Sequence, residues 1–199
     1  MTKKRIAAYI IDMLIVTIIS SFIYTLPLFA KDQEYYLNNY ESYTKTYTEY
    51  LKNNKNEEDL VNSEYKMIKS SSTILIIKVG VTLIYFSILP YFKNGQTIGK
   101  KIFKLRIGQA NQKELKPGNF FIRGLISSVV LIDIINLFIL LLSNKNLYLI
   151  TSIITSYLTY MFYITSFICI LINKNKRSFH DLITNTKVIE TKQIYVQNL

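Results

Sequence analysis

The chain has 199 residues, 50% of them hydrophobic, and a formal net charge of +11. Its apolar residues are gathered in long blocks and lack the periodicity of a soluble core, which argues against an ordinary soluble domain. A positive charge of this size could indicate nucleic-acid binding, but the placement of the charges along a membrane protein explains it better, so we expect no nucleic-acid partner.

Four apolar blocks are each close to or longer than the ~20 residues that a helix needs to cross a bilayer. They cover residues 6–29, 73–92, 120–142 and 147–172. Lipid offers the backbone no hydrogen-bond partners, so such blocks are expected to be helices. We therefore predict an all-α membrane protein with four transmembrane helices that contacts the lipid bilayer.

The first segment, residues 1–29, starts with a basic cluster and continues into the first apolar block. Asp12 lies seven residues after Arg5, which is close to two helical turns. It is therefore expected on nearly the same helix face as Arg5 and about 10 Å deeper. A charged side chain at a membrane helix centre costs about 2.5–3.5 kcal/mol, so Asp12 requires a partner or a function.

Residues 30–72 form a polar segment rich in Tyr, Asn, Lys and Glu. Tyrosines recur at helical spacing and form one stripe, which consists of Tyr36, Tyr40, Tyr43, Tyr47 and Tyr50. Residues 53–56 indicate a turn, and the acids at 57–59 are typical of the first turn of a second helix. We predict an external helical hairpin. Its tyrosines either pack against the returning helix or present an aromatic face to a partner or the outer lipid surface.

The predicted second and third membrane helices, residues 73–92 and 120–142, carry polar side chains within apolar sequence. Lys78 lies about five residues from the outer end of its helix, where its ammonium group can reach the interface. Asp133 lies near the middle of the third helix, and Asn136 follows one turn later. Alternatively, Lys78 pairs with Asp133 across the bundle, and these three residues are candidates for transport or ion binding.

The link at residues 93–119 begins with a run that looks like a phosphate-binding loop but does not meet its spacing. Three residues, and not four, separate Gly95 from the next Gly-Lys pair, and Lys101 stands where Ser or Thr is required. Residues 103–107 then alternate apolar and basic, and residues 108–112 indicate a turn. We predict a small cytoplasmic basic hairpin or interfacial segment in contact with anionic lipid headgroups.

The tail, residues 173–199, holds His180 next to Asp181. No nucleophile stands beside them, and one His and one Cys give no metal-ligand spacing, so we expect no cofactor, no metal and no enzyme activity. Asp181 is expected to pin the tail to the basic link through a charge-assisted bond with Arg123, Lys100 or Lys101. Residues 186–189 could then pair as a strand with residues 103–107.

The basic residues are concentrated in the N-terminus, the link with Arg123, and the tail. These parts hold 16 of the 24 Lys and Arg residues against three acids, and four crossings would place all of them on one side. Short basic loops stay in the cytoplasm. We therefore expect a multi-pass protein of the bacterial cell membrane with both termini cytoplasmic.

Three sequence motifs read together show a family resemblance: residues 5–12 (RIAAYIID), 95–107 (GQTIGKKIFKLRI) and 177–189 (RSFHDLITNTKVI). Together they resemble the RDD family of bacterial membrane proteins, named for one arginine and two aspartates. The match of motifs makes these Arg5, Asp12 and Asp181. It also takes in Arg123 and covers most of the chain except residues 30–72, which look like an insertion. One departure is Asn185, where a small residue is usual.

The resemblance implies an integral membrane protein, and cation/proton exchange is among the activities proposed for the family. Asp12 could bind a proton or a monovalent cation, or it could form a buried ion pair with Arg123, Lys100 or Arg5. We therefore consider a small transporter or cation/proton exchanger, expected to be a homo-oligomer because four helices enclose little volume. The alternative is a non-catalytic membrane scaffold whose buried charges fix helix packing. The candidate structural charge network comprises Arg5, Asp181, Arg123, Lys100, Arg177 and His180.

Overall fold

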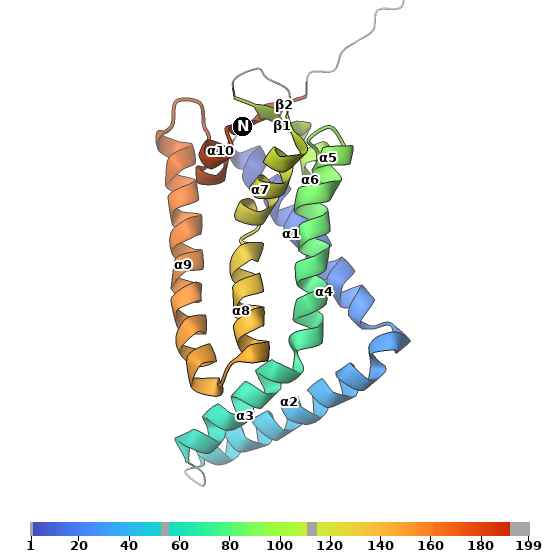
Figure 1. The fold of residues 1–199 in the computed structure, drawn as a ribbon, viewed down its shortest axis with the longest axis vertical. Coiled ribbons are helices and arrows are strands. Elements are labelled where there is room, and N and C mark those ends of the chain that lie inside the picture. The colour runs from blue at the N-terminus through green and yellow to red at the C-terminus, as the bar shows by residue number, and fades with distance from the viewer. Residues whose placement is uncertain (1, 53–55, 111–114, 192–199) are drawn as a thin grey trace, which may run out of the picture. The chain divides into compact units, whose positions relative to one another are not determined.

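The computed structural model describes residues 2–52, 56–110 and 115–191 (Figure 1). The helices are α1 (Thr2–Tyr24), α2 (Ala30–Leu51), α3 (Glu57–Ser70), α4 (Ser72–Leu83), α5 (Leu89–Phe92), α6 (Ile98–Ile102), α7 (Pro117–Ser127), α8 (Val130–Leu142), α9 (Lys145–Ile172) and α10 (Phe179–Ile183). The strands are β1 (Leu105–Gln109) and β2 (Thr186–Glu190). The turns expected at residues 53–56 and 108–112 fall partly outside the described residues.

Among the described residues, three helices are long and apolar enough to cross a membrane: Thr2–Tyr24, Ser72–Phe92 and Lys145–Ile172. A fourth crossing is present if α7 and α8 together form one broken span, with a bend of 65° between them. The chain is thus an all-α membrane protein with three to four spans and a very small sheet.

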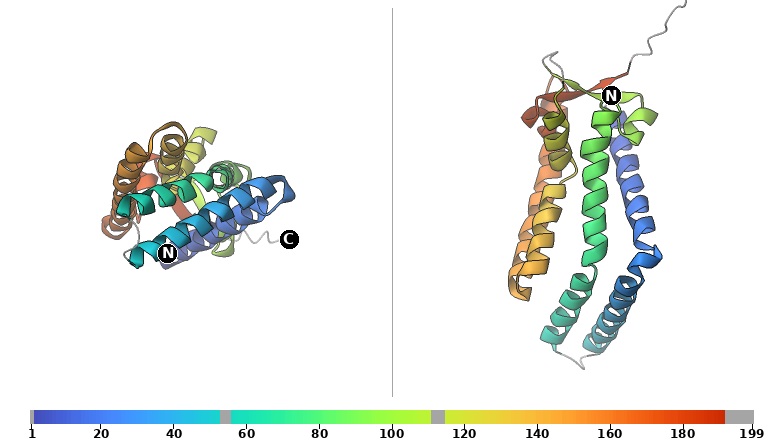
Figure 2. Two further views of the ribbon diagram at one scale, coloured as in Figure 1. Left: turned by 90° about the horizontal axis from the view of Figure 1, so that it is seen from below. Right: turned by 45° about the vertical axis from the view of Figure 1, so that its right-hand side comes forward.

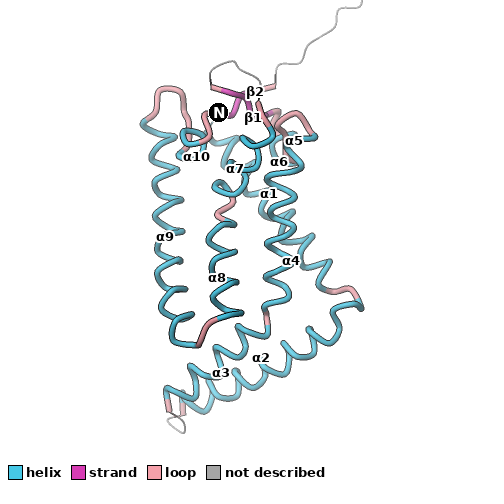
Figure 3. The backbone as a smooth tube through the Cα atoms, in the orientation of Figure 1, coloured by secondary structure: helices cyan, strands magenta, loops and turns pink. Residues whose placement is uncertain are grey.

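The expected continuous helix over residues 120–142 is wrong, because the structure starts it at Pro117 and interrupts it after Ser127. Figure 3 shows this interruption as a loop between two helical tubes. Val129 has a φ of 58°, which is strained for a β-branched residue and ends the helical geometry. Ser128 donates from its hydroxyl to the Gly124 carbonyl oxygen at 2.6 Å, which completes the last turn of α7.

The second span contains a π-helical segment, Ile84–Ile88, between α4 and α5. Tyr85, Phe86 and Ser87 in this segment are all buried. Gly124 of α7 packs closely against it, since a Cβ atom there would lie 2.1 Å from Ser87 Oγ. The π-helical segment therefore holds a close helix crossing and aims Tyr85 into the interior.

The chain divides into two compact units, which we describe separately. The first unit comprises Met1–Val16, Thr82–Leu131 and Leu158–Leu199. In it β1 pairs antiparallel with β2, from Leu105 opposite Glu190 to Gln109 opposite Thr186, and the two strands are magenta in Figure 3. The expected pairing of the link with the tail is thereby confirmed. Of the two alternatives for the link, a hairpin or an interfacial segment, the described residues show no strand pairing within the link, because β1 pairs with β2 in the tail.

The second unit comprises Thr17–Val81 and Ile132–Tyr157 and includes the helical hairpin of α2 and α3 (Figure 2, right). The tyrosine stripe of α2 divides in two: Tyr40 and Tyr47 are exposed, and the other three members are half-buried. Tyr36 stacks on Tyr40 with 6.1 Å between ring centroids. The three half-buried tyrosines therefore contribute to packing, and Tyr40 and Tyr47 remain at the surface.

Candidate functional site

Asp12, the first of two buried carboxylates, lies in α1 and is fully buried. It accepts three short hydrogen bonds from residues far away in the sequence. The donors are Tyr85 Oη at 2.6 Å, Thr97 Oγ1 at 2.5 Å and Gly99 N at 2.7 Å. The ammonium nitrogen of Lys100 lies 3.6 Å from Asp12 Oδ2. The charge of Asp12 is thus balanced inside the protein.

The glycine-rich run in the link forms this environment. Thr97 is the N-cap of α6, and its hydroxyl accepts from the Lys100 backbone N–H. Gly99 has no room for a side chain, since a Cβ atom would lie 2.2 Å from the Ala8 carbonyl oxygen and 2.8 Å from Asp12 Oδ1. The run that fails as a phosphate loop therefore presents its backbone and hydroxyl donors to a carboxylate of the same chain.

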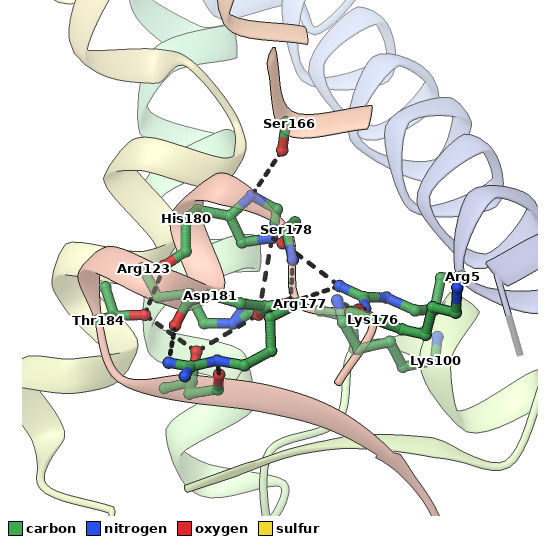
Figure 4. Close-up of polar contacts among 12 residues, drawn as sticks. Arg5, Lys100, Arg123, Ser166, Lys176, Arg177, Ser178, His180, Asp181 and Thr184 are labelled. Carbon is green, nitrogen blue, oxygen red and sulfur yellow. Dashed lines mark hydrogen bonds and ion pairs between the residues drawn. The ribbon is translucent and has the colours of Figure 1, made fainter. Parts of the chain in front are cut away.

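Asp181, the second buried carboxylate, is the N3 residue of the capping box of α10 and is also fully buried. It accepts from Arg5 Nη2 at 2.5 Å and pairs with Arg123 Nη2 at 2.7 Å (Figure 4). The Ser178 backbone N–H donates to it at 3.1 Å. Arg5 also donates to the Lys176 carbonyl oxygen. Burial alone would raise the pKa of Asp181, but the neighbouring positive charges, led by Arg123, lower that pKa below its usual value.

His180 is a neutral member of this site. Its Nε2 atom lies 2.8 Å from Ser178 Oγ, and its Nδ1 atom lies 3.5 Å from Ser166 Oγ. Burial, with the positive charge of Arg123 in second place, lowers the pKa of His180 to about 3. His180 therefore acts as a hydrogen-bonding link between α9 and α10, and not as a cation.

Arg177 fixes the backbone of the tail. Its Nε donates to the Thr186 carbonyl oxygen at 3.0 Å, and its Nη2 donates to the Asp181 carbonyl oxygen at 2.8 Å. Asn185 has a φ of 51° and accepts from Arg177 through Oδ1 at 3.3 Å. Asn tolerates this left-handed conformation better than most residues, which explains why it can occupy a position where a small residue was expected.

The structure separates the predicted site residues into two groups. The first unit contains the whole candidate charge network and also Asp12: Arg5, Asp12, Lys100, Arg123, Arg177, His180 and Asp181. Of the possible partners, Asp12 has Lys100, whereas Arg5 and Arg123 pair with Asp181.

The second group lies in the second unit, around a cavity of about 140 Å³. Lys78, Asp133 and Asn136 all line this cavity. Asn136 accepts from the Thr155 hydroxyl at 2.9 Å. These residues stay together as candidates, but they are not part of the Asp12 site.

Sequence reasoning missed Tyr85, Thr97 and Ser178 as partners of the two carboxylates. Thr97 and Ser178 had a signal, because each precedes a short helix as an N-cap residue. Tyr85 had none, because its orientation depends on the π-helical segment. No cluster of three or more His, Cys, Asp or Glu side chains suited to a metal ion occurs in the described part of the chain.

Apolar helices of membrane-spanning length and two buried, paired carboxylates define this chain as an integral membrane protein with an internal charge network. A family model described as RDD family matches residues 2–185, and the chain belongs to that family. The match includes Arg5, Asp12 and Asp181 and extends across residues 30–72. Comparison with curated proteins and with solved structures gave no match.

Proposed function

We propose that this protein is a small membrane transporter that exchanges a monovalent cation for a proton at the Asp12–Lys100 pair. The observation that carries the proposal is the different pairing of the two buried carboxylates. Asp181 is paired with two arginines, and Asp12 has a lysine 3.6 Å away. Arginine stays protonated in proteins, whereas a buried lysine readily loses its proton. The first pair is therefore permanent, and the second can change its charge.

The exchange keeps the site neutral in both states. A cation that binds Asp12 repels the Lys100 ammonium group, which releases one proton, and departure of the cation lets Lys100 take up a proton again. Burial lowers the pKa of Lys100 to about 8, although the charge of Asp12 acts in the opposite direction. Deprotonation at one pH unit below that pKa costs about 1.4 kcal/mol. The hydroxyl oxygens of Tyr85 and Thr97 beside Asp12 are ligands suited to a hard cation.

The proposal includes a location. The concentration of basic residues in the N-terminus, the link and the tail favours a cytoplasmic position for both termini in a bacterial cell membrane. A homo-oligomer remains part of the proposal, because three to four spans enclose little volume.

Vesicles made with the purified full chain test the proposal. A sodium or potassium gradient should drive proton movement with the wild type and not with Asp12→Asn. Lys100→Arg should also abolish the coupled movement, because arginine keeps its proton. Lys101→Arg is the matched control, since Lys101 is exposed one residue away, and should remain active. Absence of cation-dependent proton movement in the wild type, or full activity of Lys100→Arg, would contradict the proposal.

A second function has an observation in its favour. Asp12 is fully buried and already accepts three hydrogen bonds, which suits a scaffold whose buried charges fix helix packing. A scaffold would tolerate Asp12→Asn in cells wherever the variant reaches the membrane and folds, whereas an exchanger would lose function. Growth or partner recovery with membrane-inserted Asp12→Asn therefore separates the two functions.

A further inference from the structure

A cavity of about 190 Å³ lies beside the charge network in the first unit. Its polar wall contains Arg5, Lys100, Arg123 and His180, which are shown in Figure 4. The rest of its lining is mainly apolar or aromatic, from α1, the π-helical segment, the sheet and α9, and includes Ile6, Tyr9, Phe86, Phe162, Tyr163 and Phe167. One wall of the cavity is therefore cationic, and the other walls are apolar, as hydrocarbon chains require.

The charges around this cavity do not cancel. Three basic side chains line it, and the two carboxylates paired with them leave one positive charge in excess among the described residues. His180 adds no charge, since its pKa is lowered to about 3 by burial. An uncompensated charge in an apolar surrounding is costly, so the cavity favours a guest with one negative charge.

Arg123 places a positive charge at the cavity wall and has one donor that no described residue satisfies. The residue is only 4% exposed, and its Nη2 atom is bound to Asp181. Its Nε atom is one of three buried side-chain polar atoms without a hydrogen-bond partner in the part of the chain that the structure describes. A guanidinium group binds phosphate oxygens with good geometry, and an orphaned buried donor is uncommon in native structures.

Three of the residues that line the cavity are also exposed at the surface of the described chain. Ile6, Tyr163 and Phe167 line the cavity and are 40%, 38% and 47% exposed. In a membrane protein these exposed apolar side chains on α1 and α9 contact lipid. The volume is below the 300–1,000 Å³ of typical small-molecule sites, so it accommodates a head group and not a whole lipid.

We infer that this cavity binds the phosphodiester head of an anionic phospholipid, whose acyl chains stay outside along α1 and α9. The lipid phosphate supplies the missing negative charge beside Arg123, Arg5 and Lys100. A zwitterionic phospholipid carries its own positive charge and would leave the excess uncompensated. The cavity shares Lys100 with the exchange proposed above but does not rest on that proposal, and its test needs no transport measurement.

The experiment uses the purified full chain in detergent and native mass spectrometry. Phosphatidylglycerol is titrated in parallel with phosphatidylcholine and with inorganic phosphate. The wild type should retain phosphatidylglycerol, should retain phosphatidylcholine at least about tenfold more weakly, and should bind no inorganic phosphate at the same concentrations. This comparison needs no variant and separates a lipid head group from a free anion.

A pair of variants locates the binding. Ser127 lines the cavity and is half-buried, so Ser127→Phe fills the space and should weaken phosphatidylglycerol binding by about tenfold or more. Ser156→Phe makes the same change at an exposed position of α9 outside the cavity and should have no effect. Equal retention of both phospholipids, equal binding of inorganic phosphate, or unchanged binding in a folded Ser127→Phe variant would overturn the inference.

Discussion

Asp181 connects three segments that are distant in the sequence. Its carboxylate pairs with Arg5 near the start of α1 and with Arg123 in α7, and it caps α10 through Ser178. Two arginines share one carboxylate, so the carboxylate removes repulsion between them as well as satisfying their donors. Asp12 differs from Asp181 in its partner, because Asp12 pairs with a lysine, and a buried lysine readily loses its proton.

Asp181→Ala should lower stability by about 3–5 kcal/mol, the usual cost of leaving buried charges uncompensated. The measurement is the melting temperature in detergent. Arg123→Ala added to this variant should cost much less than Arg123→Ala alone, since the ion pair is already absent. Lys101→Ala, at an exposed position, should add independently. Simple additivity of Asp181→Ala with both Arg123→Ala and Arg5→Ala would show that no network exists.

Lys100 makes stability depend on alkaline pH. Burial lowers its pKa in the folded protein to about 8 from a usual value of 10.5, so between these values the unfolded chain binds more protons. Stability should therefore rise with pH in that window, by up to about 1.4 kcal/mol per pH unit. Lys100→Arg is the reference, because it keeps its proton. The difference in melting temperature, wild type minus Lys100→Arg, should increase from pH 8 to pH 10, and a constant difference would contradict the assignment.

At the scale of elements, the membrane helices were predictable because their apolar blocks are long enough to span hydrocarbon. The break at Val129 was not, because the sequence on both sides of it stays apolar. The strand pair was visible as alternation in residues 103–107. The partner of Asp12 stays open among Arg5, Lys100 and Arg123 in the sequence, because sequence distance does not show which basic side chain lies nearest in space.

Two glycines test how α6 packs on α1. Gly99→Ala would place a Cβ atom 2.2 Å from the Ala8 carbonyl oxygen, which forces α6 away from Asp12. Overpacking of this kind costs about 1–3 kcal/mol, and the melting temperature should fall accordingly. Gly118→Ala is the matched control, because nothing lies within 4 Å of its added Cβ atom. Equal stability of the two variants would show that the close approach at Gly99 does not matter.

For the whole molecule, the ion pairs constrain the number of times that the chain can cross the membrane. Arg5 starts α1 and Asp181 follows α9, and their contact requires both to lie on the same side. The number of crossings must then be even. Three of the described helices are long and apolar enough to cross, so an even number is reached if the broken pair of α7 and α8 supplies a fourth crossing. The pairing of Arg123 with Asp181 places the α7 end of that broken span on the same side.

Single cysteines can test this topology in a Cys169→Ser background. Glu58 lies in the hairpin before the second span, and Lys93 lies after α5, which ends that span. Both positions are exposed, so each is replaced by cysteine in turn. With the basic segments in the cytoplasm, an impermeant thiol reagent should label Glu58→Cys in intact cells and Lys93→Cys only after lysis. Lys174→Cys, after α9, should behave like Lys93→Cys, because four crossings return the tail to the starting side. Labelling of Lys174→Cys from outside would mean an odd number of crossings, and the Arg5–Asp181 pair could not form within one chain.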